Sequence, residues 1–243
     1  MIREKFERYD FAIILGATSG IGSGIANKLS NKVKTIYLFG RNLDKLSILK
    51  NELSQIETLK IYVEQVDFED NDSIIQAKID SLNIQKSVGI LVNCVGTYVS
   101  KKFAGSTYED ITKHFLINVI RPMQIISNWI CYLETGSLII NIGSSLSYHP
   151  KSNRVLSSSV KHAVRGFSLS LAEELADVGI RVCLVNPRSV ATSLLKKNSS
   201  NESYQKAMPV EDIVRTVEMI LYCDNKTLFS EINVGASQGF LGH

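Results

Sequence analysis

Short apolar segments alternate along this chain with longer amphipathic ones, and this alternation constrains the fold more than any other feature. Seven segments rich in β-branched and aromatic residues are predicted as strands: Phe11–Leu15, Thr35–Phe39, Lys60–Val66, Gly89–Asn93, Ser137–Ile142, Arg181–Val185 and Glu231–Val234. Helix-like segments lie between them, near residues 20–31, 42–54, 71–83, 107–133, 157–178 and 210–222. This order predicts an α/β fold, in which a doubly wound parallel sheet of about seven strands carries helices on both faces.

The composition fits one globular domain over residues 1–243, without a linker or internal repeat that would divide it. Hydrophobic residues make up 44% and charged residues 21%, which disfavours fibrous and disordered classes. The formal charge of +3 is too small and too evenly spread for a nucleic-acid surface. No apolar stretch reaches the roughly 18 residues of a membrane span. The charged N-terminus and four dispersed cysteines predict a cytoplasmic protein without a secretory signal, metal site or structural disulfide.

Three glycines follow the first predicted strand and open the first predicted helix, with the spacing G-x-x-x-G-x-G. Gly16 permits a tight turn, and Gly20 and Gly22 let the backbone approach a pyrophosphate and let the helix pack closely on the strand. Amides at the N-terminus of the helix then face the phosphates. The turn therefore predicts a dinucleotide site, with a purely structural turn as the alternative.

The end of the second predicted strand indicates which dinucleotide is bound. Phe39-Gly40-Arg41-Asn42 offers no carboxylate at the place where NAD sites bind the ribose 2′-hydroxyl. Arg41 instead offers a guanidinium that pairs well with a 2′-phosphate. This predicts NADP(H) rather than NAD(H), and the alternative is an ordinary surface arginine at a strand–helix turn.

These motifs resemble those of the short-chain dehydrogenase/reductase family, in the family's order and over essentially the whole chain. Gly16-Ala17-Thr18-Ser19-Gly20-Ile21-Gly22 resembles its nucleotide turn, and Val66-Asp67-Phe68 resembles the segment whose acidic residue contacts the adenine. Asn93-Cys94-Val95-Gly96 resembles the Asn-Asn-Ala-Gly segment, with cysteine in place of the second asparagine. The resemblance implies a Rossmann-type domain that binds a nicotinamide dinucleotide through these residues.

The same resemblance implies a catalytic set in the second half of the chain. Asn118 matches the helical asparagine that holds a proton-relay water, and Ser144 matches the catalytic serine. Lys161 matches the lysine that binds the nicotinamide ribose, and Pro187 and Thr192 match cofactor contacts after the sixth strand. These matches imply an oxidoreductase acting on a small carbonyl or alcohol substrate.

The family's Tyr-x-x-x-Lys motif is broken. Lys161 follows Ser144 by seventeen residues, as the motif requires, but Ser157 stands at the tyrosine position. In the family that tyrosine is the general acid, whereas an alkanol such as Ser157 is shorter and a poorer proton donor than a phenol. Loss of a positioned acid costs on the order of 10²–10⁴ in rate, although hydride transfer still gains from positioning.

Three interpretations stay open. In the first, the chain is a working NADPH-dependent reductase whose proton comes through Ser157 and a water, from Tyr148 or, as a weaker candidate, from Tyr98. In the second, it binds NADP(H) without turnover, as a sensor or an inactive partner subunit. In the third, Ser157 is an introduced substitution. Asn118 and Ser144 favour the first, because nucleotide binding alone needs neither.

The substrate pocket is expected beyond the carboxyl ends of the strands, with walls from residues 145–150 and 188–195. The polar segment 196–206 is expected to form a surface loop or a mobile lid beside it. Arg188 either attracts a carboxylate or phosphate of the substrate or pairs with a local acid. The two longest helical segments match those through which family members associate, so the resemblance implies a homodimer or homotetramer.

Overall fold

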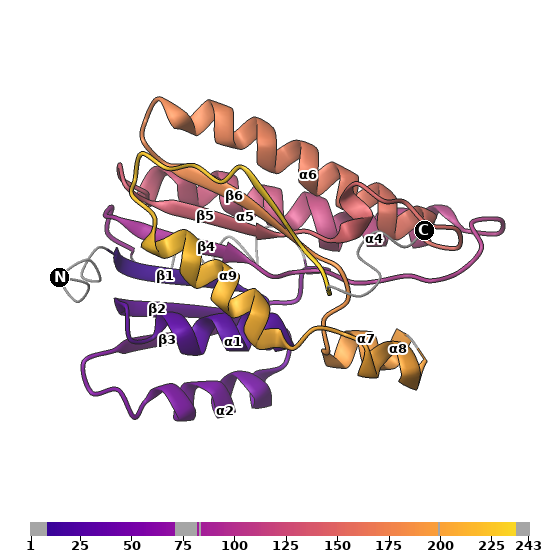
Figure 1. The fold of residues 1–243 in the computed structure, drawn as a ribbon. Coiled ribbons are helices and arrows are strands. Elements are labelled where there is room, and N and C mark those ends of the chain that lie inside the picture. Colours follow the sequence, from indigo (N-terminus) through magenta and orange to yellow (C-terminus); the bar gives the residue numbers. More distant parts are fainter. Residues whose placement is uncertain (1–8, 71–81, 83, 199, 237–243) are drawn as a thin grey trace.

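The computed structural model describes residues 9–70, 82, 84–198 and 200–236. These residues form one sheet of seven strands in the order β3-β2-β1-β4-β5-β6-β7 (Figure 1). The strands are β1 (Tyr9–Leu15), β2 (Val33–Gly40), β3 (Lys60–Gln65), β4 (Gly89–Asn93), β5 (Leu138–Ile142), β6 (Arg181–Pro187) and β7 (Glu231–Val234). Every neighbouring pair is parallel, so the predicted doubly wound α/β class is confirmed.

The central strands are buried on both faces of the sheet. In β1, Ala12 and Ile14 belong to the hydrophobic core on one face, and Phe11, Ile13 and Leu15 belong to the core on the other. Successive side chains of a strand point to opposite faces, so both sets need apolar residues when both faces are covered. This explains why the central strands appear in the sequence as continuous apolar runs.

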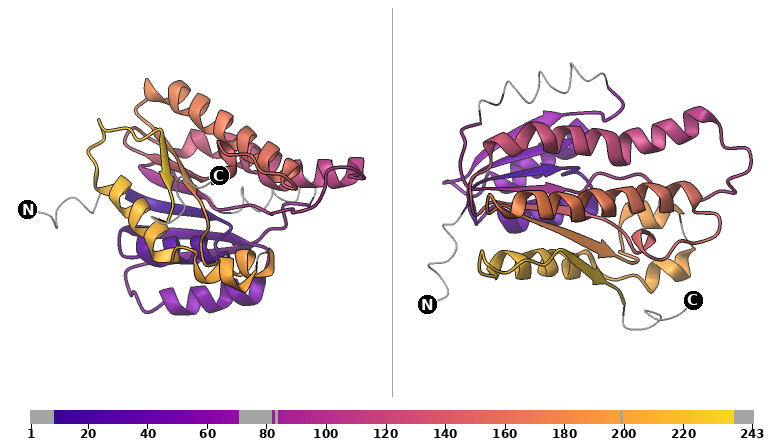
Figure 2. Two further views of the ribbon diagram at one scale, coloured as in Figure 1. Left: turned by 45° about the vertical axis from the view of Figure 1, so that its right-hand side comes forward. Right: turned by 90° about the horizontal axis from the view of Figure 1, so that it is seen from above.

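Helices cover both faces of the sheet, with α1, α2 and α9 on one side and α5 and α6 on the other (Figures 1 and 2). The helices are α1 (Gly20–Leu29), α2 (Leu43–Leu53), α4 (Tyr108–Phe115), α5 (Arg121–Trp129), α6 (Val155–Ala176), α7 (Ser193–Asn198), α8 (Asn201–Gln205) and α9 (Val210–Tyr222). A π-helical turn covers Leu116–Ile120, and 3₁₀ turns cover Ile130–Tyr132 and Ser145–Ser147. The predicted helix at 71–83 lies outside the described residues, apart from Leu82. Within the described ranges, no helix has the length and apolar character needed to cross a membrane.

The predicted long helix at 107–133 is interrupted where α4 passes through the π-helical turn into α5. The side-chain amide of Asn118 donates a hydrogen bond to the His114 carbonyl at 2.8 Å. Pro122, in the first turn of α5, has no N–H to continue the helical ladder. These two local features explain the break, which the amphipathic pattern of the segment does not reveal.

The polar segment 196–206 is mostly helical, which corrects the expectation of a loop, while a role as a mobile lid stays a prediction. It contains the end of α7 and all of α8. Ser200 Oγ accepts a hydrogen bond from the Ser203 amide at 3.2 Å and caps α8, and Lys206 pairs with Glu202 at 2.6 Å. Capping and i,i+4 pairing therefore stabilise helical structure in a segment whose polar composition indicated a loop.

The strand order reverses at β1, which lies between β2 and β4. Leu15, the last residue of β1, pairs with Phe39 on one side and with Asn93 on the other. The connections that leave β1 and β4 run in opposite directions, so a crevice opens between them at the carboxyl edge of the sheet. The fold thus places the glycine turn beside the segments that follow β4, β5 and β6.

Gly22 packs directly against the turn that precedes α1. A β-carbon at this position would lie 2.3 Å from the Gly16 carbonyl oxygen, which belongs to the backbone and cannot move aside easily. We expect Gly22→Ala to lower the free energy of unfolding of the nucleotide-free protein by about 1–3 kcal/mol, measured by thermal unfolding. Gly166→Ala in α6 is the matched control, since nothing lies within 4 Å of the added carbon. Equal losses in both variants would contradict this account of the turn.

Candidate active site

The turn between β1 and α1 provides a binding place for an anion. Gly16 has a φ of +77°, in the left-handed region that favours glycine. Ser19 caps α1, and its Oγ accepts a hydrogen bond from the Gly22 amide at 2.9 Å. The first-turn amides of Gly20 and Ile21 have no acceptor within the helix, so they are available to a phosphate at the positive end of the helix dipole.

The residues predicted for the adenosine half of the cofactor lie at the ends of β2 and β3. Arg41 is exposed just after β2. The Thr18 side chain packs against Gly40, the last residue of that strand. A β-carbon on Gly40 would lie 3.0 Å from the Thr18 side chain. Asp67 is partly exposed after β3, and the neighbouring Phe68 is buried. These positions border the glycine turn along one side of the crevice.

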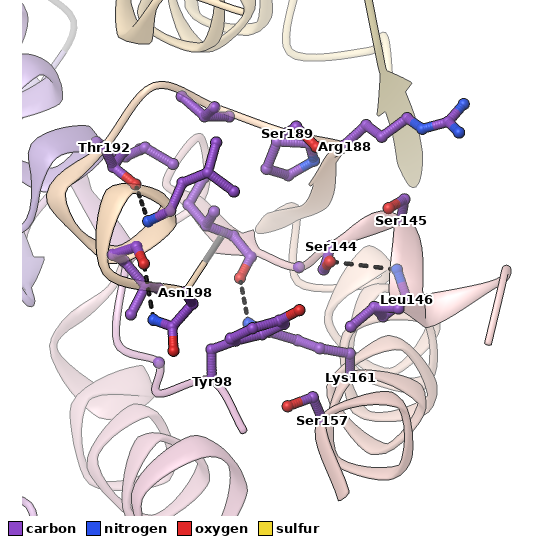
Figure 3. Close-up of a pocket in the computed structure, with 18 of the residues that line it drawn as sticks. Tyr98, Ser144, Ser145, Leu146, Ser157, Lys161, Arg188, Ser189, Thr192 and Asn198 are labelled. Atoms are coloured by element: carbon purple, nitrogen blue, oxygen red, sulfur yellow. Dashed lines mark hydrogen bonds between the residues drawn. The ribbon is translucent and has the colours of Figure 1, made fainter. Parts of the chain in front are cut away.

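A cavity of about 410 Å³ lies at the carboxyl edge of the sheet (Figure 3). The predicted site residues that line it are Ser19, Gly20, Ile21, Gly96, Ser144, Ser157, Lys161, Pro187 and Thr192. The other predicted site residues, all of which are described, lie outside its lining: Gly16, Thr18, Gly22, Arg41, Asp67, Phe68, Asn93 and Asn118. Small-molecule sites commonly enclose about 300–1,000 Å³, so this cavity suits a small ligand together with part of a cofactor.

Ser144 follows β5 and is oriented by a buried amide behind it. Its backbone N–H donates to Asn186 Oδ1 at 3.1 Å, and its Oγ accepts from the Leu146 amide at 3.2 Å. Asn186 is fully buried and donates to Glu231 at 2.7 Å, while Arg165 holds Glu231 through bidentate hydrogen bonds. This chain of contacts holds Ser144 at the cavity wall, where its hydroxyl proton can point toward a ligand.

Lys161 extends from α6 to the ends of β4 and β5. Its Nζ donates to the Ile142 carbonyl at 3.2 Å and would lie 3.4 Å from a β-carbon on Gly96. Burial lowers the pKa of Lys161 to about 8, and the nearby Cys94 opposes this shift. Burial also raises the pKa of the Cys94 thiol to about 12. At neutral pH the pair is therefore mainly an ammonium beside a neutral thiol.

Ser157 lies one helical turn before Lys161, and its hydroxyl is already hydrogen-bonded twice. Its Oγ accepts from the Val99 N–H at 2.9 Å and donates to the Val99 carbonyl at 2.9 Å. The Ser157 side chain is only 2% exposed, and His114 Nε2 lies 3.4 Å from the same oxygen. The proton of this hydroxyl is thus used to bind the backbone of the segment after β4.

Asn118 and His114 hold the same segment from the opposite side. Asn118 Oδ1 accepts from the Thr97 N–H at 2.9 Å, and its amide donates to Thr97 Oγ1 at 2.8 Å. Thr97 Oγ1 also lies 3.1 Å from His114 Nδ1. Burial, with a contribution from Lys161, lowers the pKa of His114 to about 4, so the imidazole is neutral near pH 7. Asn118 therefore fixes the backbone after β4, and its role with a relay water stays a prediction.

Of the two phenols considered as substitute acids, Tyr98 lines the cavity and Tyr148 does not. Figure 3 shows Tyr98 at the cavity that Lys161 and Ser144 also line. Tyr148 instead lies against the His149 ring, with ring centroids 4.7 Å apart, and burial raises its pKa. The weaker of the two sequence candidates is thus the one that the fold brings to the site.

The cavity has a basic lining. Lys151, Arg154, Lys161 and Arg188 contribute to it, and no Asp or Glu is found among the described residues that line it. The Arg154 guanidinium lies 4.7 Å from the centroid of the Tyr98 ring. The Arg188 side chain extends away from Lys161 and Tyr98 (Figure 3). The excess of positive charge favours anionic ligands in the cavity.

The sequence reasoning missed Asn186 and His114, which shape the site from behind. Asn186 is a polar residue inside an apolar strand, and a buried amide of this kind needs a partner. His114 precedes Asn118 by four residues, a spacing that places both on one helix face. These signals indicate buried polar contacts, but they do not show which segment of the chain the two residues bind.

The chain belongs to the short-chain dehydrogenase/reductase family. Residues 10–203 match the family model described as short chain dehydrogenase. An uncharacterized oxidoreductase of Staphylococcus epidermidis is 26% identical over 226 residues, which cover 92% of this chain and 95% of that relative. A similar oxidoreductase of Staphylococcus aureus is 25% identical over 225 residues, with the same coverage of both chains. The protein is thus an oxidoreductase of the short-chain type.

Solved structures share its fold. A dehydrogenase/reductase from Sinorhizobium meliloti superposes with a TM-score of 0.84 at 23% identity, over 97% of this chain and 98% of the other. A short chain dehydrogenase from Burkholderia cenocepacia in complex with NADP gives a TM-score of 0.82 at 18% identity, over 95% and 97% of the two chains. Both likenesses confirm the doubly wound architecture along nearly the full length of the chain.

The buried ammonium of Lys161 gives a testable effect of pH on stability. Folding lowers the pKa of Lys161 to about 8, so the buried charge destabilises the folded protein near pH 7. This destabilisation is lost as the pH rises from about 8 toward the pKa that lysine has in the unfolded chain. We expect Lys161→Met to raise the free energy of unfolding of the nucleotide-free protein by about 1–3 kcal/mol near pH 7, and by less near pH 10. Denaturant unfolding at both pH values measures this, with the exposed Lys45→Met as control. A gain that does not shrink with pH would contradict the role given to burial.

Proposed function

We propose that this protein is an NADPH-dependent reductase of a carbonyl group on a small substrate, with a proton path altered at Ser157. One observation carries the proposal: Ser144, Lys161 and the N-terminal end of α1 line a single cavity at the switch point of the sheet. Such a reaction needs three parts: a hydroxyl for the substrate oxygen, a cation for the ribose and a helix end for the phosphates. Ser144, Lys161 and the start of α1 supply them in this order.

The residues around the glycine turn fit NADP(H). The side chain of Thr192 packs against the start of α1, because a β-carbon on Gly20 would lie 3.1 Å from Thr192 Cγ2. A larger residue than glycine at position 20 would therefore narrow the approach to the first-turn amides. Arg41 is exposed at the end of β2, where it can pair with a 2′-phosphate. The turn, Arg41 and Lys161 would hold the cofactor, and when bound it supplies the hydride.

The residues of the chain would divide the remaining work. Ser144 donates a hydrogen bond to the substrate carbonyl oxygen and stabilises the negative charge that develops there. Lys161 binds the ribose hydroxyls and adds positive charge in a poorly hydrated site, where electrostatic interactions are stronger than in water. Asn118 keeps the segment after β4 in place as one wall of the cavity.

A nucleotide-binding protein without turnover is the second candidate. The state of Ser157 favours it, because the single proton of that hydroxyl is donated to the Val99 carbonyl and none is left to donate to a substrate. In this case the protein would act as a sensor or as an inactive partner subunit. The two candidates differ in whether NADPH is consumed.

Assembly as a homodimer or homotetramer stays a prediction from the family. Ile120 and Met123, near the start of α5, are 50% and 38% exposed, which supports a contact surface on that side. A cytoplasmic location likewise stays a prediction.

Arg41 provides a test of cofactor choice. We expect Arg41→Ala to weaken NADPH binding about 10- to 100-fold and to leave NADH binding nearly unchanged, because only NADPH carries the 2′-phosphate. Fluorescence titration with each cofactor measures this, and Arg215→Ala on the exposed face of α9 is the matched control. An equal loss for both cofactors would argue against a specific phosphate contact.

The activity itself is tested by NADPH oxidation with small carbonyl compounds, in pairs that differ only in a carboxylate or phosphate group. We expect turnover by the native chain, with the anionic member of each pair preferred. Ser144→Ala should lower kcat by about 10²–10³ without changing NADPH affinity, and Ser47→Ala on α2 should have no effect. Tight NADPH binding with no turnover of any compound would overturn the reductase proposal and favour the second candidate.

A further inference from the structure

The segment after β4 is fastened to α6 through one residue, Val99. Its N–H and its carbonyl both bond to Ser157 Oγ, because a hydroxyl can accept and donate at once. A tyrosine at position 157 could not make this contact, since its hydroxyl lies beyond a ring. The serine therefore fastens the segment to α6 by a contact that a tyrosine could not make.

Tyr98 is the residue that this arrangement positions. On one side of it, the Thr97 amide donates to Asn118, and on the other, Val99 is bonded to Ser157. With both neighbours fixed to buried side chains, the backbone of Tyr98 has little freedom. Its side chain lines the cavity together with Lys161 and Ser144 (Figure 3).

One cation lies over the Tyr98 ring, and a second lines the same cavity. The Arg154 guanidinium is 4.7 Å from the ring centroid, and its Nη1 is buried without a hydrogen-bond partner. Lys161 lines the same cavity and adds a second positive charge to it. Positive charge near a phenol stabilises the phenolate and so assists proton donation. Among the described residues that line the cavity, Tyr98 is the only tyrosine, and His, Asp and Glu are absent.

We propose that Tyr98 is the general acid of this reductase, and that Ser157 is a positioning residue that holds it in place. This inference rests on the proposed function. The carbonyl carbon accepts a hydride from NADPH, which becomes NADP⁺, as the π bond of the carbonyl breaks. The carbonyl oxygen accepts the phenolic proton of Tyr98, and a proton from the solution then restores the phenol, so each turnover consumes one NADPH and one proton. The phenol that the family takes from the helix is supplied here by the segment after β4.

Removal of the Tyr98 hydroxyl is the direct test. With a substrate that the native chain reduces, we expect Tyr98→Phe to lower kcat by about 10²–10⁴, with NADPH affinity unchanged. Tyr148→Phe and the exposed Tyr108→Phe keep the activity of the native chain. Native activity in Tyr98→Phe would overturn the assignment.

A double-mutant cycle tests the positioning role of Ser157. Ser157→Ala should lower kcat in the native background and have little further effect in the Tyr98→Phe background, since both changes disable the same step. Ser157→Thr keeps the hydroxyl and should retain most of the activity. Losses that multiply in the double variant would show that Ser157 acts independently of Tyr98.

A measurement without cofactor checks the same contact. In the nucleotide-free protein, hydrogen exchange of the Val99 amide should be faster in Ser157→Ala, because the amide loses its acceptor, and unchanged in Tyr98→Phe. Unchanged exchange in Ser157→Ala would overturn the anchoring of the segment. If the native chain binds NADPH but reduces no carbonyl, the proposed function and the acid role fail together. If the native chain is active and Tyr98→Phe equally so, only the acid role fails.

Discussion

Burial of the parallel sheet on both faces is the constraint on which the rest of the structure depends. Side chains such as Ile13 and Ile14 of β1 face opposite cores, so neither face of the sheet centre is open to a ligand. What remains accessible is the edge where parallel strands end, and the strand order reverses there between β1 and β4. The glycine turn, Ser144 and Lys161 come from distant parts of the sequence and meet at that edge because the sheet leaves no other place.

The contact between Ser157 and Val99 then fixes one wall of the cavity at this edge. One side chain cannot both bond the Val99 backbone through its own oxygen and extend a phenol to a substrate. In this protein Ser157 bonds the Val99 backbone, which holds the segment after β4 close to α6 and leaves Tyr98 in the cavity. The electrostatics suit this arrangement, because burial keeps His114 neutral while Lys161 stays mainly charged near neutral pH.

Much of the fold was predictable because its signals are local. The bounds of β4 and β7 agree at both ends with their apolar runs, and the other strands differ by at most two residues at an end. The two secondary-structure predictions that were wrong, the unbroken helix at 107–133 and the loop at 196–206, also have local causes. Asn118 and Pro122 break a helix that is amphipathic throughout, and side-chain capping forms α8 in a segment that is polar throughout. Patterns of hydrophobicity do not register either effect.

The sequence by itself determined the α/β class, the glycine turn after β1 and the register of Ser144 with Lys161, since each depends on residues close together or at fixed spacing. Only the tertiary structure decided the state of the site. Ser157 and Val99 are 58 residues apart, and Ser144 and Asn186 are 42 apart, so no spacing rule relates them. Such hydrogen bonds exist only when packing of the strands and helices brings their atoms within reach. For the same reason the sequence could name Tyr98 and Tyr148 as phenols, but only the packed fold selected Tyr98 for the cavity.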